Sequence, residues 1–84
     1  MHPEDLVLYV KSGCHLCDEA RARLAAAGLE VREVDVLTSI ALFERYRHRV
    51  PVLADVSGRT WIEGRFDDAA LRRLLRRMSP QPNP

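Results

Sequence analysis

The sequence predicts a single α/β domain with a four-stranded mixed sheet and helices on both faces. The chain has 84 residues, which is the length of one small domain. Its apolar segments alternate between short β-branched runs and stretches with apolar residues three or four positions apart, typical of strands and helices in turn. The order along the chain is β-α-β-α-β-β-α, so the first two strands are expected to be parallel and the last two antiparallel.

The N-terminal part is predicted to form a βαβ unit. Residues Leu6–Val10 are a continuous apolar run, typical of a central strand that is covered on both faces. A helix is expected from about Cys14 to Ala27, with Gly28 as its C-terminal stop, and extended structure from Leu29 to Val36. The apolar stripe of this helix consists of Leu16, Ala20, Leu24 and Ala27.

A short second helix is expected next. Thr38 or Ser39 has the side chain of a helix N-cap. Ile40, Phe43 and Tyr46 follow at helical spacing and are predicted to share the apolar face. The helix is expected to end among cations, which favour a helix C-terminus: Arg45, Arg47, His48 and Arg49.

The C-terminal part is predicted to form a hairpin and a final helix. Two strands, Val50–Val56 and Arg59–Glu63, flank a tight turn at Ser57-Gly58. Asp67 or Asp68 is expected to cap the last helix. Its apolar stripe consists of Leu71, Leu74, Leu75 and Met78.

Charge and composition argue against several classes of protein. The net charge is +1, whereas nucleic-acid-binding proteins carry a pronounced basic excess, so no nucleic acid is expected. No long apolar stretch follows the acidic N-terminus, so we expect no signal peptide, no membrane contact and a cytoplasmic location. The domain is expected to span residues 1–78, and residues 79–84, with three prolines, are predicted to be a disordered tail.

The two cysteines of the chain stand in Cys14-His15-Leu16-Cys17, where a predicted strand gives way to a predicted helix. A thiolate at a helix N-terminus is stabilised and becomes a nucleophile. Cys14 is therefore the predicted nucleophile, with hydrogen bonds from the backbone amides near Leu16 and Cys17 and with Lys11 and His15 as nearby cations that favour the thiolate.

The predicted reaction is attack by Cys14 on a substrate disulfide, followed by resolution of the mixed disulfide by Cys17 or an external thiol. The negative charge of Asp18 is expected to keep Cys17 a thiol at rest. Two alternatives stay open, namely half of a zinc site and an inert pair in a binding domain. A full zinc site needs four ligands, and the three histidines form no second pair at finger-like spacing.

With these motifs identified, the chain resembles the short glutaredoxin-like proteins of the thioredoxin fold over about residues 5–77. The resemblance rests on Lys11–Cys17, the strand Glu33–Val36, Val50-Pro51 and Gly64–Asp68. It implies a thioredoxin-like fold with the family's strand order, and thiol–disulfide oxidoreductase activity on protein or glutathione mixed disulfides. It also implies a cis peptide bond before Pro51, beside which the preceding backbone pairs with the substrate.

The resemblance further implies a glutathione or substrate site, from which this chain departs at three positions. Arg49 stands where the family usually has Thr, Arg65 where it has a second Gly, and His15 where it has Pro. Arg49 and Arg65 are expected to pair with glutathione carboxylates or an acidic protein surface, or to be solvated. The implied binding residues are Lys11, Leu16, Arg49, Val50, Pro51, Gly64, Arg65, Asp67 and Asp68.

No tightly bound cofactor and no metal ligands are expected, and glutathione is a candidate co-substrate. The expected partners are protein disulfides, glutathione and a reductase as electron donor. Two further classes remain as alternatives to an oxidoreductase. One is a glutathione-ligated iron–sulfur or zinc-binding module, and the other is a non-catalytic adaptor with a thioredoxin fold.

Overall fold

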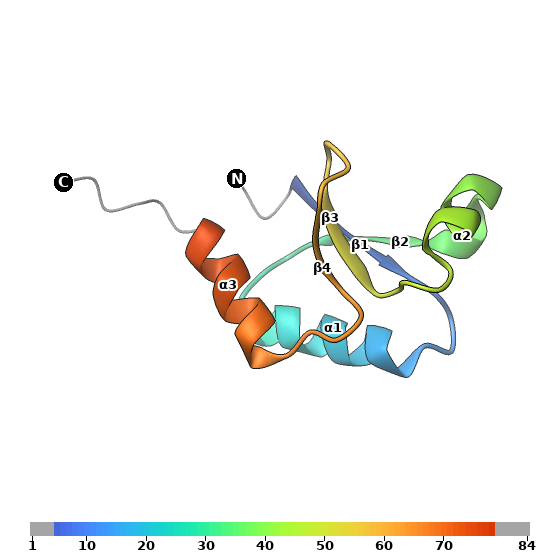
Figure 1. Cartoon of the computed structure of the whole chain (residues 1–84). Helices are drawn as coiled ribbons and strands as arrows, with labels where there is room; N and C mark the ends of the chain where they lie inside the picture. The colour runs from blue at the N-terminus through green and yellow to red at the C-terminus, as the bar shows by residue number, and fades with distance from the viewer. Residues whose placement is uncertain (1–4, 79–84) are drawn as a thin grey trace.

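A computed structural model describes residues 5–78 and has the predicted order of elements (Figure 1). Residues 79–84, predicted to be a disordered tail, and residues 1–4 of the predicted domain lie outside the described residues. No helix within residues 5–78 is both long enough and apolar enough to cross a bilayer. The elements are β1 (Leu6–Val10), α1 (His15–Ala26), β2 (Arg32–Asp35), the 3-10 helix η2 (Val36–Thr38), α2 (Ile40–Tyr46), β3 (Val52–Asp55), β4 (Thr60–Glu63) and α3 (Asp68–Met78).

The sheet has the order β2-β1-β3-β4, which places β1 inside it as predicted. The pairing of β1 with β2 is parallel, and Val7 lies opposite Arg32. The pairings of β1 with β3 and of β3 with β4 are antiparallel, with Leu8 opposite Leu53 and Leu53 opposite Ile62. The carboxyl ends of β1 and β2 and the start of β3 therefore meet at one edge of the sheet.

Helices cover both faces of the sheet, as predicted. In Figure 1, α1 lies below the sheet, α3 lies to its left and α2 lies at its right-hand end. Because side chains alternate along a strand, Leu53 packs in the main core cluster with Leu24 of α1 and Leu74 of α3. The alternate residues of β3, Val52 and Ala54, belong to a second cluster on the other face. That cluster includes Val36 and Tyr46, with Tyr9, Leu42, Phe43 and Val50 packed against it.

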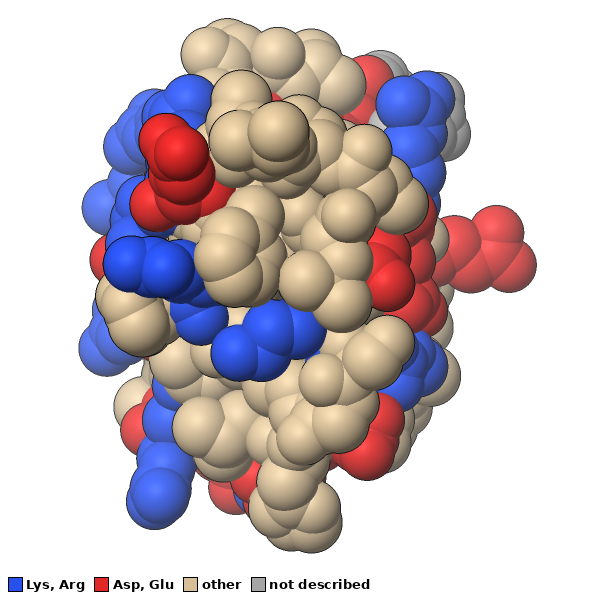
Figure 2. Space-filling view, turned by 90° about the vertical axis from the view of Figure 1, so that its right-hand side faces the viewer, with Lys and Arg blue, Asp and Glu red and all other residues tan. Residues whose placement is uncertain are grey.

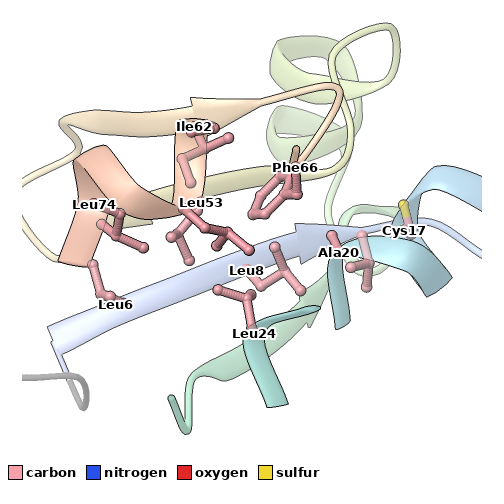
Figure 3. Packing of buried hydrophobic residues seen from close by; sticks show 12 residues of the cluster. Leu6, Leu8, Cys17, Ala20, Leu24, Leu53, Ile62, Phe66 and Leu74 are labelled. Carbon is pink, nitrogen blue, oxygen red and sulfur yellow. The ribbon is translucent and has the colours of Figure 1, made fainter. Parts of the chain in front are cut away.

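The main core cluster extends along the sheet from one end of the domain to the other. Figure 3 shows Cys17 at one end, next to Ala20, and Leu6 and Leu74 at the opposite end. Cys17, Leu6 and Leu74 are at most 2% exposed. The sulfur of Cys17 is thus anchored in the same apolar core that holds the sheet to its helices.

The apolar faces of α1 and α2 differ from the predicted stripes at one residue each. Leu16 is 36% exposed, because the buried stripe of α1 runs through Cys17, Ala20 and Leu24, and a residue next to Cys17 is turned about 100° away from it. Ile40 is 80% exposed. The buried face of α2 instead consists of Leu42, Phe43 and Tyr46.

The hairpin contains a β-bulge that its sequence did not indicate. Leu53 pairs with Ile62 but Ala54 pairs with Thr60, so Trp61 has no partner across the ladder. The extra residue lets Trp61 and Ile62, although adjacent in sequence, both pack against the main core cluster. The indole ring therefore lies on the α3 side of the sheet.

The turn between β3 and β4 is organised by the carboxylate of Asp55. Its oxygens accept hydrogen bonds from the N–H and hydroxyl of Ser57, from the N–H of Arg59 at 3.1 Å, and from the indole N–H of Trp61 at 2.9 Å. The hydrogen bond from the Ser57 hydroxyl, followed by that from Trp61, lowers the pKa of Asp55 to about 2. These bonds favour the ionised carboxylate.

The turn is therefore expected to lose stability in acid. A depressed pKa contributes stability that is present above the unfolded value of 3.8 and is lost as the pH falls towards 2. Urea unfolding of the parent and of Asp55→Asn at pH 5, 4, 3 and 2 measures this contribution. The parent is expected to be more stable than Asp55→Asn at pH 5, and the difference is expected to shrink between pH 4 and pH 2. A difference that stays constant over this range contradicts the expectation.

Candidate functional site

The two cysteines form a disulfide at the junction between β1 and α1. Cys14 and Cys17 are bonded through their sulfur atoms, and their Cα atoms lie 5.2 Å apart. Cys14 is half-buried, whereas Cys17 is 1% exposed within the main core cluster. The two residues therefore differ in accessibility although they share one bond.

Cys14 is the N-cap residue of α1. Its backbone is extended (φ −101°, ψ 107°), and its Sγ accepts a hydrogen bond from the N–H of Cys17 at 3.1 Å. A Ser or Asp side chain makes the same contact at an N-cap, because a helix leaves its first amides unpaired. The amide of Leu16, also predicted to donate, makes no such bond within the described part of the chain.

Lys11 and His15, the two basic residues predicted to favour the thiolate, have no side-chain partners within residues 5–78. Lys11 is half-buried and His15 is exposed. Neither side chain forms an ion pair or a hydrogen bond with any residue of the described chain. Their stabilisation of the Cys14 thiolate stays a prediction, which rests on their nearness to Cys14 in the sequence.

The carboxylate of Asp18 is paired rather than free to act on Cys17. Its Oδ1 accepts a hydrogen bond from Arg21 Nη1 at 2.8 Å. The same guanidinium donates two bonds of 2.9 Å to Glu33 on β2. The bond with Glu33 is the largest cause of the raised pKa of Arg21. Because Arg21 offsets the charge of Asp18, we expect Asp18 to influence Cys17 less than the sequence suggested.

Val50 and Pro51 lie at the same edge of the sheet as the disulfide. The bond between them is cis, which confirms what the resemblance implied. Val50 is half-buried and packs against the main core cluster, as Cys14 does. The buried Pro51 accepts a hydrogen bond from the N–H of Gly64 at 2.9 Å through its carbonyl, which ties the turn after β4 to the start of β3.

Arg49 is bound within the protein instead of being solvated. Its Nε donates to Glu63 Oε2 at 2.8 Å, and its Nη2 donates to the hydroxyl of Thr60 at 3.3 Å. The guanidinium also lies 5.3 Å from the centre of the Tyr46 ring. The hydrogen bond between Arg49 and Glu63 raises the pKa of the arginine and lowers that of the carboxylate. Any acidic substrate at Arg49 has to compete with Glu63.

The turn after β4 is formed around Gly64. Gly64 has φ +78°, a left-handed conformation that glycine adopts without strain. Asp67 is the N-cap of α3, since its carboxylate accepts a hydrogen bond from the N–H of Ala70 at 2.9 Å. Asp68 is the first residue of the helix and forms an ion pair with Arg23 of α1 at 2.5 Å. Of the two predicted capping residues, Asp67 therefore has that role.

The structure brings some of the predicted binding residues together but not all of them. Arg65 and Asp67 line a hollow of about 240 Å³ together with Glu19 and Arg23. The other predicted binding residues lie outside this hollow. Within residues 5–78, no three side chains of His, Cys, Asp or Glu lie close enough to hold a metal ion.

The end of the domain that carries α2 has mixed charge. Figure 2 shows this face with much uncharged surface in its middle and side chains of both charges around it, Lys and Arg being most numerous on the left. Leu37 of η2 and Ile40 of α2 line a groove of about 560 Å³ there, together with Ser39, Phe43, Glu44 and Arg47. This groove contains none of the predicted site residues.

Sequence reasoning missed the contribution of Glu63 to this region. Arg49 and Glu63 are 14 residues apart and come from different elements, so no local spacing indicated their contact. The register of the hairpin would have revealed it, since Val52 lies opposite Glu63 and Arg49 precedes that strand. The bulge at Trp61 obscured this register in the sequence.

Sequence and fold comparisons agree on the family. The sequence matches the family described as "Glutaredoxin-like domain (DUF836)" over residues 5–76, and no curated protein has a matching sequence. The X-ray structure of protein XcR50 from X. campestris is similar with a TM-score of 0.75 and 39% identity, covering 89% of this chain and 99% of that chain. The solution structure of XcR50 gives a TM-score of 0.73 at 39% identity, with coverages of 90% and 96%.

The solution structure of protein Ne2328 from Nitrosomonas europaea is also similar, with a TM-score of 0.69 and 29% identity, covering 89% of this chain and 93% of that chain. The family match covers nearly all of the described residues and includes both cysteines, the cis bond at Val50-Pro51 and the turn at Gly64. The thioredoxin-like fold predicted from the resemblance is confirmed by these neighbours. On these grounds the chain belongs to the glutaredoxin-like domain (DUF836) family.

Proposed function

We propose that this protein is a thiol–disulfide oxidoreductase that reduces mixed disulfides through Cys14 and Cys17. The observation that carries the proposal is the hydrogen bond from the N–H of Cys17 to the Sγ of Cys14, at the N-terminus of α1. In the reduced protein the same amide and the positive end of the helix dipole favour a thiolate at Cys14. The family match supports a redox role for the pair.

Reduction of a substrate disulfide then takes two exchange steps. The thiolate of Cys14 attacks one substrate sulfur, which forms a mixed disulfide and releases the other sulfur as a thiolate that takes a proton from water. Cys17 loses its proton and attacks the Sγ of Cys14, which re-forms the bond between the two cysteines and releases the second substrate thiol. The substrate gains two electrons from the two cysteines and two protons, one of which comes from water and the other from the thiol of Cys17.

The roles of the two cysteines follow from their difference in burial. A substrate disulfide has to approach the attacking sulfur in line with its own bond, which requires access from the surface. Cys14 is half-buried, whereas Cys17 is 1% exposed. Cys17 is placed to reach Cys14, to which it is bonded in this structure, and has little access to anything else.

We assign the substrate groove to the edge of the sheet where Cys14, Val50 and Pro51 lie. Lys11 and Leu16 flank it in sequence, and Arg65 and Asp67 line the neighbouring hollow. Protein mixed disulfides are favoured over glutathione alone, since Arg49 is engaged by Glu63 and Arg65 replaces the second glycine. Glutathione or a reductase regenerates the two thiols, and a reducing compartment such as the cytoplasm suits this cycle.

Alkylation of the reduced protein tests whether Cys14 is activated. The rate of reaction with iodoacetamide, measured against pH, is expected to have its midpoint below the pH of about 8.5 at which free cysteine ionises, because the amide of Cys17 and the helix dipole stabilise the thiolate. Cys17→Ser isolates the signal of Cys14, and Cys14→Ser is the matched control, in which alkylation is expected to be slow because Cys17 is buried. A midpoint for Cys14 at or above about 8.5 removes the basis of the proposal.

A further inference from the structure

Three arginines converge on a small hollow between β4 and α3. Arg59 comes from the hairpin turn, and Arg73 and Arg77 come from successive turns of α3. Together with Thr60 and Trp61 they line a space of about 160 Å³. Local spacing in the sequence gave no reason to associate Arg59 with the arginines of α3.

Trp61 holds two of these arginines in place. The β-bulge turns its ring towards α3, and its indole N–H donates to Asp55 at 2.9 Å, so the ring is fixed at both its apolar and its polar side. The guanidinium carbon of Arg59 lies 4.7 Å from a ring centroid and that of Arg77 lies 5.8 Å away. Both distances are within the range of a cation–π contact, which positions the two side chains without neutralising them.

The arginines of this hollow lack the ion-pair partners that other arginines of residues 5–78 have. Arg21, Arg23 and Arg49 each form an ion pair with a carboxylate. Within residues 5–78, Arg59, Arg73 and Arg77 form none. The carboxylate of Asp55, which lies next to Trp61, is occupied by hydrogen bonds within its own turn.

The helix dipole does not account for this arrangement. Cations in the last turn of α3 are favoured by the dipole, which explains Arg76 and Arg77. Arg73 and Arg77, however, are four residues apart and repel each other across one turn of the helix, and Arg59 adds a third like charge from the hairpin. An anion bound between the three guanidinium groups removes this repulsion and satisfies their N–H donors.

From this arrangement we propose that the hollow lined by Arg59, Trp61, Arg73 and Arg77 binds a phosphate group of a small anionic ligand. Guanidinium groups donate paired hydrogen bonds that match the geometry of phosphate oxygens. The hollow is compact, and the whole chain has a net charge of only +1. Both properties favour the binding of one phosphorylated group over that of an extended polymer.

The phosphate site is separate from the cysteine pair. Leu74 lines the hollow and lies at the end of the main core cluster opposite Cys17, as Figure 3 shows. The turn that carries Arg59 follows Asp55, which pairs with Leu6 at the start of β1, whereas Cys14 follows the end of that strand. Binding at this hollow is therefore expected to be independent of the redox state of the cysteines.

Titration with inorganic pyrophosphate, followed by ³¹P NMR or calorimetry in low salt, tests this inference. Arg59→Gln and Arg73→Gln are each expected to weaken binding about tenfold, the loss of one charge-assisted interaction. Arg76→Gln is the matched control: it removes the same charge from the same helix, does not line the hollow, and is expected to change the affinity by less than about twofold. The parent is expected to bind equally well with Cys14 and Cys17 reduced or oxidised.

Two results of the pyrophosphate titration overturn the inference, and a third comes from a different probe. Absence of pyrophosphate binding by the parent is one, and an equal loss of affinity in Arg76→Gln and Arg73→Gln is the other, since it reveals only a diffuse attraction between charges. A third arm uses a single-stranded oligonucleotide as the probe. Tighter binding of the oligonucleotide than of pyrophosphate, weakened by the same substitutions, assigns the site to a polymer backbone and overturns the small ligand.

Discussion

Cys14→Ser is expected to abolish disulfide reduction, lowering the rate to that of the uncatalysed reaction, a fall on the order of a thousandfold or more. A hydroxyl at this N-cap keeps a hydrogen bond from the N–H of Cys17 but is not ionised near neutral pH. The substitution therefore preserves the start of α1 and removes the nucleophile. Reduction of insulin disulfides in the presence of dithiothreitol measures the rate.

Cys17→Ser is expected to behave differently, because it leaves the first exchange step intact. Treatment with glutathione disulfide is expected to leave a glutathione adduct on Cys14, visible as a mass increase that persists until an external thiol is added. Cys14→Ser is the control and is expected to form little adduct, since Cys17 is 1% exposed. Helix content and the urea midpoint of both variants check that each is folded.

Two outcomes contradict this division of roles. The first is reduction of insulin by Cys14→Ser at the rate of the parent. The second is an adduct that maps to Cys17 when both cysteines are present. Protein caught on Cys14 of the Cys17→Ser variant in cells identifies the client, and glutathione caught alone argues for glutathione as the main substrate.

Much of the fold follows from local patterns in the sequence. The strand at Leu6–Val10 was predictable to the residue, since a strand covered on both faces is apolar throughout and ends where Lys11 begins a turn. β2 was predicted over Leu29–Val36 but covers only Arg32–Asp35. It is an edge strand whose four residues are exposed or half-buried, and the carboxylate of Asp35 accepts a hydrogen bond from the N–H of Leu37 at 2.8 Å, which turns the chain into η2.

Contacts between distant residues were not predictable in this way. The bulge at Trp61 depends on how β4 meets β3 and α3 together, and the pair Arg49–Glu63 depends on the resulting register. Ile40 has the spacing of a buried residue, yet it is exposed. The seven-residue helix α2 buries only the side that carries Leu42, Phe43 and Tyr46. Periodicity identifies an apolar stripe, but only tertiary packing selects which of two overlapping stripes faces the core.

The cysteine pair is the part of the candidate site that was most accessible to sequence reasoning. Its chemistry is local, because Cys14 caps the helix that contains Cys17. The binding residues proposed beside it are not local, since Val50, Pro51 and Asp67 come from segments more than 30 residues away in the chain. Only the family resemblance indicated the cis bond at Pro51, since about 5% of X-Pro bonds in folded proteins are cis.

Leu53→Ala is expected to lower the free energy of unfolding by about 3 kcal/mol, within the range of about 2–5 kcal/mol for truncation of a buried leucine. Leu53 is 0% exposed at the centre of β3, with Leu8 opposite it on β1 and Ile62 on β4. Both flanking strands are held by backbone hydrogen bonds, so they have little freedom to close the cavity. Urea unfolding of the oxidised protein measures the effect.

Leu37→Ala is the matched control for this prediction, because it removes the same atoms from a side chain that is 55% exposed. We expect it to cost less than about 0.5 kcal/mol. A domain of this size is expected to have a total stability of roughly 4–13 kcal/mol, so the core substitution removes a large share and the surface one does not. Equal losses in the two variants, or a loss below about 1 kcal/mol in Leu53→Ala, contradict the packing of Leu53 with Leu24 of α1 and Leu74 of α3 described above.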